Sequence, residues 1–156
     1  MNKSDEKKNQ MIKTVFNCGI AKFKAINDLG VNSKDNMACI SIICSEDSPF
    51  LINFDYWLTG IQLQFDDVEN ENYPPLHPIS KDQAKSIVEF IKEIHSFNEP
   101  LSLIIHCTAG VSRSAAIGKF INDYYGLDLP NYRRLDLFNR YVYRMLFNEV
   151  YDVYRY

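Results

Sequence analysis

No uninterrupted run of apolar residues in this sequence approaches the roughly 18 residues that a membrane-spanning helix requires. Residues 1–10 are largely charged and polar and lack the apolar stretch of a signal peptide, so we expect them to form a flexible, solvated tail. With neither feature in the sequence, we expect no membrane span and a reducing, cytoplasmic compartment in which the cysteines are free thiols.

Two further absences narrow the class of protein. The four cysteines (18, 39, 44 and 107) form no CxxC pair and have no accompanying histidine spacing, which argues against a zinc site. The formal net charge is −3, so the sequence lacks the basic balance of a general nucleic-acid binder. We therefore expect no metal, no other cofactor and no general affinity for nucleic acids.

Apolar residues make up 46% of the 156 residues, which is enough for one packed core. We expect residues 11–156 to form a single catalytic domain. Patterns of apolar residues predict strands at 12–16, 37–44, 61–65 and 101–105. Helical spacing predicts helices ending near Gly30, opening at Ser80 with a Ser80–Gln83 capping box, running from Arg113 to Gly126, and covering about 132–150. This alternation predicts an α/β fold with a central mixed or parallel sheet flanked by helices on both faces.

A short glycine-containing loop follows the strand expected at 101–105 and leads into the helix that begins near Arg113. Such a loop can direct successive backbone N–H groups into one concavity above the positive end of the helix dipole. Gly110 permits a close backbone approach that a side chain would block. The guanidinium of Arg113 matches two phosphate oxygens and stays charged at any working pH. The segment therefore predicts a site for a tetrahedral anion.

Cys107 stands at the mouth of this loop. A free thiol has a pKa of about 8.5, and the surrounding amides and Arg113 favour its thiolate, which is the nucleophilic form. Ser114 can donate a hydrogen bond to the sulfur and steady it as attacker and as leaving group. We expect His106 to orient the loop through hydrogen bonds rather than to act as a base.

These residues resemble the signature of the protein tyrosine phosphatase superfamily, HCx5R followed by serine or threonine. The form HCxAGxSRS is similar to the dual-specificity branch. The resemblance implies the cysteine-based phosphatase fold, a phosphocysteine intermediate, and catalytic roles for Cys107, Arg113 and Ser114. It also implies that the substrate phosphate is bound by Thr108, Ala109, Gly110, Val111, Ser112 and Arg113.

Members of this superfamily carry a general-acid aspartate on a separate loop upstream of the cysteine. Asp66 and Asp67 follow the strand expected at 61–65, and the family's pattern selects Asp67, with Asp66 as the alternative. Both aspartates could instead be turn formers. Asn139 resembles an asparagine near the phosphate loop of dual-specificity enzymes, although Phe138 stands where those enzymes usually have proline. The other interpretation of Asn139 is a surface helix residue.

Cys44 ends a strand that, in the family's sheet order, lies beside the strand leading to Cys107. Lipid-phosphatase relatives carry a similar cysteine that forms a reversible disulfide with the nucleophile, so Cys44 is a possible redox residue. The other interpretation is a small apolar core residue.

The resemblance also bears on the substrate. The chain shows no tyrosine-containing loop of the kind that deepens the pocket of tyrosine-specific enzymes, and the variable loop positions are neutral. We therefore expect a phosphorylated protein as partner and substrate, with phosphotyrosine and phosphoserine or phosphothreonine accepted. The alternatives are an RNA 5′-triphosphatase or phosphoinositide phosphatase of the same superfamily, and a catalytically weak phosphate-binding interaction module.

Overall fold

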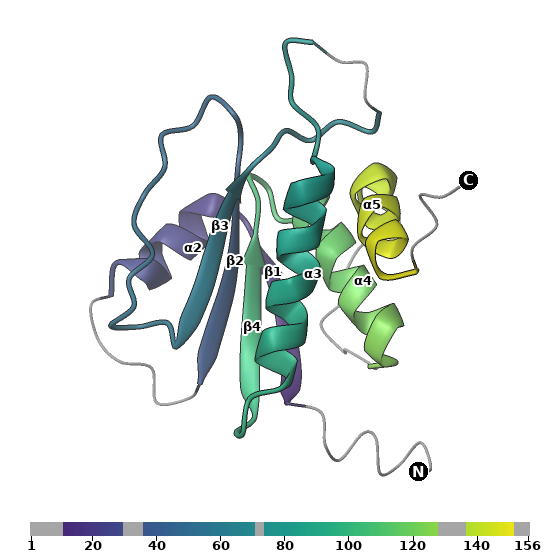
Figure 1. The fold of residues 1–156 in the computed structure, drawn as a ribbon. Helices are drawn as coiled ribbons and strands as arrows, with labels where there is room; N and C mark the ends of the chain where they lie inside the picture. Colours follow the sequence, from purple (N-terminus) through teal and green to yellow (C-terminus); the bar gives the residue numbers. More distant parts are fainter. Residues whose placement is uncertain (1–10, 30–35, 71–73, 128–136, 152–156) are drawn as a thin grey trace.

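The computed structural model describes residues 11–29, 36–70, 74–127 and 137–151, which contain four strands and four helices (Figure 1). In chain order these are β1 (Ile12–Cys18), α2 (Ile20–Asn27), β2 (Met37–Ile43), β3 (Thr59–Gln64), α3 (Lys81–His95), β4 (Leu101–His106), α4 (Arg113–Tyr125) and α5 (Arg140–Tyr151). The tail expected at 1–10 lies outside the described residues. All four expected strands are present, each within two residues of its predicted bounds at either end.

The strands form one sheet in the order β1-β4-β2-β3. Every neighbouring pair is parallel, so the α/β class is confirmed, and the described sheet is parallel rather than mixed. Parallel strands end at a common edge, where ligands of α/β folds usually bind. His106 at the end of β4 is in register with Cys18 of β1 and Ser41 of β2, so the segment after β4 emerges between its two neighbours.

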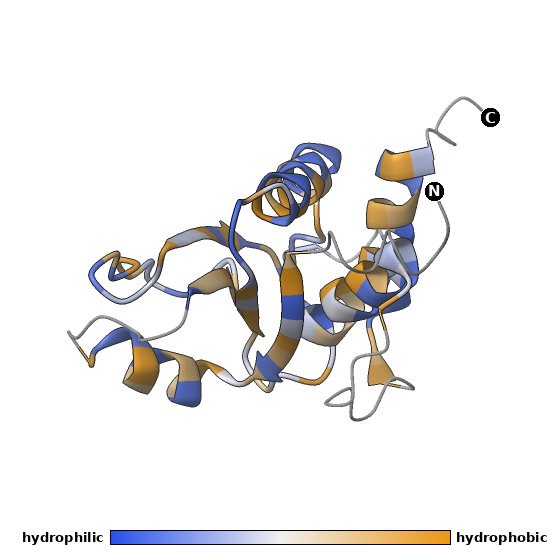
Figure 2. Cartoon of the chain, turned by 90° about the horizontal axis from the view of Figure 1, so that it is seen from below, coloured by the Kyte–Doolittle hydropathy of each residue, from blue (hydrophilic) through white to orange (hydrophobic). Residues whose placement is uncertain are grey.

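Helices cover both faces of the sheet, as expected (Figures 1 and 2). On one face, Phe23 of α2 and Trp57 pack against Cys39 and Ile104 of the central strands. On the other face, α3, α4 and α5 pack together over the larger core. Burial on both faces explains why β2 and β4 are almost continuously apolar, since neither has a solvated side.

The ends of α3 and α4 lie where local capping residues predict them. At the start of α3, the Ser80 hydroxyl accepts from the Gln83 backbone and the Gln83 side chain accepts from the Ser80 backbone, so the capping box is confirmed. The helix after the loop begins at Arg113, as expected. It ends at Gly126, whose φ of 63° lies in the left-handed region that glycine adopts without strain.

Two predicted helix boundaries differ from the structure. α5 begins at Arg140 rather than near Tyr132, and residues 132–136 lie outside the described part of the chain. α2 ends at Asn27, so its end near Gly30 was predicted too late; Gly30 itself lies outside the described residues. Asn27 is buried and its amide donates to the carbonyl of Leu51, a contact between distant segments that local sequence does not reveal.

Candidate active site

The segment between β4 and α4 folds as a tight loop against the end of β1. Gly110, in the middle of this loop, has a φ of +79°. A Cβ atom at Gly110 would lie 2.5 Å from the carbonyl carbon of Cys18. This is a steric clash with the backbone, so β1 or the loop would have to shift to accommodate a side chain. The backbone N–H of Ile20 also donates to the carbonyl of Thr108 over 3.1 Å. The loop therefore needs glycine at 110 both for its conformation and for its packing.

Cys107 points into this loop and is only 2% exposed. Its Sγ lies 3.2 Å from the Ser114 hydroxyl and accepts a hydrogen bond of 3.2 Å from the Gly110 N–H. Burial raises the pKa of the Cys107 thiol, but hydrogen bonds from Ser114, Gly110 and Ser112 prevail, and the pKa lies below its ordinary value. The loop thus stabilises the thiolate with the same amide groups that can bind an anion.

Arg113 is the first residue of α4, and its side chain is 3% exposed. One terminal nitrogen donates to the carbonyl of Phe65 over 2.7 Å, and the other donates to the Thr108 hydroxyl over 2.9 Å. The guanidinium is thereby held across the loop, between the ends of β3 and β4. Its Nε has no hydrogen-bond partner among the described residues. Because a buried cation with an unsatisfied donor is costly, this site favours a bound anion.

His106 lies beneath the loop and is fully buried. Its Nε2 is 2.6 Å from the hydroxyl of Ser41, which also accepts from the Gln62 amide. The other ring nitrogen, Nδ1, lies 3.2 Å from the Cys107 carbonyl and is the donor there. Burial lowers the pKa of His106 to about 4, which keeps the ring neutral at physiological pH. The ring is thereby hydrogen-bonded both to β2 and to the first backbone carbonyl of the loop.

Sequence reasoning missed Ser41. The signal was a hydroxyl residue in the middle of the apolar run 37–44, on a strand with no solvated face. A buried hydroxyl in such a position needs a partner. The sequence alone does not show that this partner is His106, because the two residues meet only through the register of β2 and β4.

The two aspartates after β3 have different environments. Asp66 is 4% exposed and accepts hydrogen bonds from the Ser45 backbone, the Ser45 hydroxyl and the His77 backbone, at 3.0, 2.6 and 2.7 Å. Burial acts to raise the pKa of Asp66, but these hydrogen bonds prevail and hold it below its usual range. Asp67 is exposed, and its Oδ1 accepts a hydrogen bond of 2.7 Å from the hydroxyl of Ser112 in the loop. Asp66 therefore ties the segment after β3 to Ser45 and His77, and Asp67 is hydrogen-bonded to the loop between β4 and α4.

Asn139 is buried at the start of α5 and joins three segments. Its backbone N–H donates to the Ser112 carbonyl over 3.1 Å, and its Nδ2 donates to Asp67 Oδ1 over 2.8 Å. Its Oδ1 accepts from the Val142 N–H over 2.9 Å, which is the bond of a helix N-cap. The structure thus places Asn139 beside the loop and not on the helix surface.

Cys44 lies beside the loop, next to Thr108 and Arg113. Cys44 Sγ is 3.5 Å from the Thr108 hydroxyl and 3.5 Å from a terminal nitrogen of Arg113, and β2 lies beside β4 as expected. Cys44 and Cys107 are both free thiols. Thr108 and Ala109 are exposed, whereas Val111 is half-buried, so the loop opens to solvent through neutral side chains.

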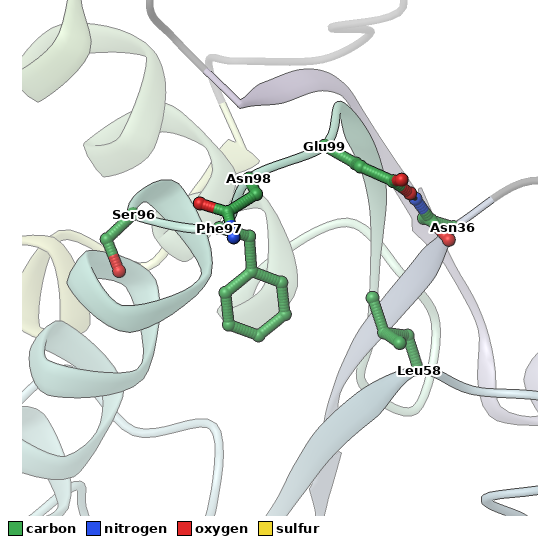
Figure 3. A pocket seen from close by; sticks show the side chains of 6 residues that line it. All are labelled: Asn36, Leu58, Ser96, Phe97, Asn98 and Glu99. Carbon is green, nitrogen blue, oxygen red and sulfur yellow. Dashed lines mark hydrogen bonds between the residues drawn. The ribbon is translucent and has the colours of Figure 1, made fainter.

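A separate cavity of about 440 Å³ lies at the opposite edge of the sheet, before the starts of β2, β3 and β4 (Figure 3). It is lined by Asn36, Leu58, Ser96, Phe97, Asn98 and Glu99. Glu99 is the one charged group among these described lining residues, and it accepts a hydrogen bond from the Asn36 amide over 2.9 Å. The described lining holds neither a thiol nor a cation, whereas the loop after β4 holds both Cys107 and Arg113.

Among residues 11–29, 36–70, 74–127 and 137–151, no group of three or more histidine, cysteine or acidic side chains is arranged to hold a metal ion. None of the four helices described is long and apolar enough to cross a membrane.

The sequence matches no family model and no curated protein. Among solved structures, the chain is similar to the human tyrosine phosphatase-like serine/threonine/tyrosine-interacting protein, with a TM-score of 0.52 and 18% identity. The match covers 92% of this chain and 97% of that chain. Identity at this level carries a likeness of fold alone. The chain therefore shares the α/β fold of a tyrosine phosphatase-like protein.

Proposed function

We propose that this chain is a metal-independent phosphatase that hydrolyses phosphate monoesters through a phosphocysteine intermediate. One observation carries the proposal: Cys107, whose pKa is lowered, and Arg113, whose buried Nε has no partner among the described residues, belong to one loop at the start of α4. A thiolate and a guanidinium around converging amides provide a nucleophile and an anion site together. Asp67, hydrogen-bonded to the same loop, supplies the remaining requirement, a proton donor.

In the first displacement, the Cys107 thiolate attacks phosphorus in line with the ester oxygen, so that an S–P bond forms as the P–O bond breaks. Arg113 and the loop amides stabilise the equatorial oxygens of the transferring group. Asp67, in its protonated form, gives its proton to the departing oxygen. The products of this step are the free alcohol or phenol and the phosphocysteine.

In the second displacement, water attacks the same phosphorus and the S–P bond breaks. Asp67, now a carboxylate, accepts a proton from that water, and inorganic phosphate is released. Cys107 departs as a thiolate, which the hydroxyl of Ser114, 3.2 Å from Sγ, stabilises. His106 stays neutral and holds the loop carbonyl, so it takes no part in proton transfer.

The proposed substrate is a phosphorylated protein, with phosphotyrosine and also phosphoserine or phosphothreonine accepted. The outermost loop side chains, Thr108 and Ala109, are small, neutral and exposed, which supports an open site over a deep one. The same neutrality counts against a multiply charged lipid headgroup. We expect the enzyme to act in the cytoplasm, where the free Cys107 thiol would stay reduced.

A second candidate is a phosphate-binding interaction module without turnover. The similar solved structure is a tyrosine phosphatase-like interacting protein, and this likeness is the observation that supports an interaction module. Such a module would need the anion site of Arg113 but neither a lowered pKa at Cys107 nor an acid at Asp67. This chain has the lowered pKa and an aspartate bound to the loop, which supports the enzyme.

Hydrolysis of para-nitrophenyl phosphate, measured with and without EDTA, tests the proposal. The wild-type chain should release para-nitrophenol at the same rate in both conditions. Cys107→Ser should release none, while it still binds phosphate because the loop amides and Arg113 remain. A folded wild-type chain that binds phosphate but gives no turnover would establish the interaction module instead, and loss of turnover in EDTA would contradict a metal-independent reaction.

A further inference from the structure

A groove of about 350 Å³ runs along the exposed side of α5. It is lined by Phe138, Arg140, Tyr143, Arg144 and Phe147. The spacing of these residues places them on one side of the helix, while Val142 and Leu146 on the other side are buried in the core. The groove is therefore a surface feature that the packing of α5 leaves open.

The aromatic side chains of this groove are held in place. Lys119 of α4 lies over the rings of Phe138 and Tyr143, at 5.5 and 5.3 Å from their centroids. The Tyr143 hydroxyl donates to Asp123 over 2.7 Å. Phe147, in contrast, is 40% exposed at the far end of the groove. Because Phe138 and Tyr143 are already held in place, a partner that binds them loses less conformational entropy. Phe147 offers the same partner an exposed apolar surface.

Along the chain, the groove starts next to Asn139 of the candidate active site. Phe138 and Arg140 are the immediate neighbours of Asn139, which contacts both Asp67 and Ser112. With a rise of about 1.5 Å per residue, Phe147 lies roughly 12 Å along α5 from Asn139. An extended peptide advances about 3.3 Å per residue, so about three or four residues beside a phosphorylated residue would span the groove.

The charge of the groove is opposite to that of the protein. Arg140 and Arg144 are both exposed, and neither forms an ion pair with any of the residues described. Arg140 stacks on the ring of Phe138 at 5.1 Å from its centroid, so its guanidinium stays at the groove. In a chain of net charge −3, two arginines that pair with no described acidic residue make a local binding surface for carboxylates.

We propose that this α5 groove binds the substrate segment next to the phosphorylated residue, and that it selects segments with an acidic side chain about three residues from the phosphate. The proposal rests on the phosphatase function and names the class of protein substrate. Arg144 pairs with the carboxylate, and the exposed ring of Phe147 covers an apolar side chain of the same segment. Segments with lysine in place of this acidic residue should have a lower kcat/KM.

The test compares two phosphotyrosine peptides that differ only in glutamate or lysine about three residues from the phosphotyrosine, with one pair made for each side. The wild-type chain should show a higher kcat/KM for the glutamate peptide, and Arg144→Glu should lower this preference by about three- to tenfold, or reverse it. Arg144→Gln should give a smaller change in the same direction. Lys92→Glu, an equal change of charge on the exposed side of α3, should leave the preference intact.

Several outcomes would overturn the groove proposal. An equal preference in wild type and Arg144→Glu, or an equal loss in Lys92→Glu, would show that the groove does not select the segment. Dissociation of a wild-type dimer by Arg144→Glu in sedimentation velocity would make the groove a contact between copies of this chain. If para-nitrophenyl phosphate is not hydrolysed at all, the phosphatase function fails separately. The dissociation constants of the same peptide pairs, measured by calorimetry, then decide whether the groove selects acidic segments.

Discussion

The hydroxyl of Ser112 donates a 2.7 Å hydrogen bond to Oδ1 of Asp67, 45 residues earlier in the chain. This bond joins the loop between β4 and α4 directly to the segment that follows β3. Asn139 donates to the same oxygen over 2.8 Å. With both donors on Oδ1, the other oxygen, Oδ2, can carry the proton that the proposed mechanism delivers to the leaving group.

Asp67→Asn should lower kcat by about 10²- to 10⁴-fold, the range for a positioned proton donor. The defect should shrink for aryl phosphates with good leaving groups, which need little protonation. Steady-state kinetics on a series of aryl phosphates would measure this.

Asp66→Asn is the matched control. It weakens the bonds to Ser45 and His77, so we expect a lower melting temperature and a smaller loss of kcat than in Asp67→Asn. A larger kcat loss in Asp66→Asn, in a protein that remains folded, would transfer the acid role to Asp66.

The Asn139 side chain caps α5 and donates to Asp67, and Asn139→Ser tests these two roles separately. Serine also caps helices, so the stability of α5 should change by less than the roughly 1 kcal/mol expected for Asn139→Ala. Both variants lose the amide that donates to Asp67, and both should lose about tenfold in kcat, as expected for a hydrogen bond to a charged group. If kcat followed the melting temperature across the two variants, Asn139 would act only through the fold.

The choice between the two aspartates shows where sequence reasoning ends. The strands, the loop and the starts of α3 and α4 follow from local patterns, and all were predicted within a few residues. Asp66 and Asp67 are adjacent, so composition and turn propensity cannot separate them. Along an extended chain, successive side chains point to opposite sides. The family's pattern selects Asp67, and its contact with the loop becomes visible only in the tertiary partners, Ser45 for Asp66 and Ser112 for Asp67.

The start of α5 was misplaced for a related reason. Helical spacing of apolar residues from about 132 predicted an early start, but Asn139 caps the helix and binds the Ser112 carbonyl. Ser112 precedes Asn139 by 27 residues, so no local sequence pattern predicts this contact. Similarly, Ser41 could be flagged as an unusual buried hydroxyl, but its pairing with His106 depends on the strand register.

The buried His106 should make the protein less stable as the pH falls. Its pKa is about 4 in the folded chain, against 6.5 ordinarily, so between these values the unfolded chain binds more protons. The free energy of unfolding should therefore decrease as the pH falls from 6.5 to 4, by about 3 kcal/mol from this group. Urea unfolding at several pH values measures the slope.

His106→Asn provides the comparison for this pH dependence. The variant will be less stable at every pH, because it loses the bond to Ser41, but its slope between pH 6.5 and 4 should be smaller. Asp66 titrates below this window, since its pKa is lowered from 3.8, and so it does not obscure the difference. Equal slopes in the two proteins would contradict the assignment.

Cys44 is expected to protect Cys107 from irreversible oxidation. Peroxide converts an exposed or reactive thiolate to a sulfenic acid, which a second thiol can capture as a disulfide with release of water. Cys44 Sγ lies 3.5 Å from the hydroxyl of Thr108, the residue after Cys107. After brief peroxide treatment, dithiothreitol should restore more activity to wild type than to Cys44→Ser.

Cys18→Ser is the matched variant on the other side of β4, because Cys18 ends β1 and is in register with His106. Its recovery should equal that of the wild type. Equal recovery in Cys44→Ser and wild type would remove the redox role of Cys44, and impaired recovery only in Cys18→Ser would assign that role to Cys18.

Trapping of the phosphoenzyme tests whether Cys107 is the nucleophile that forms a phosphocysteine. The wild-type chain should be mixed with para-nitrophenyl phosphate, denatured within the first turnovers, digested and analysed by mass spectrometry. We expect one phosphoryl group on the peptide that contains Cys107, a larger trapped fraction in Asp67→Asn, and none in Cys107→Ser. A phosphoryl group on any other residue, or continued turnover by Cys107→Ser, would contradict it.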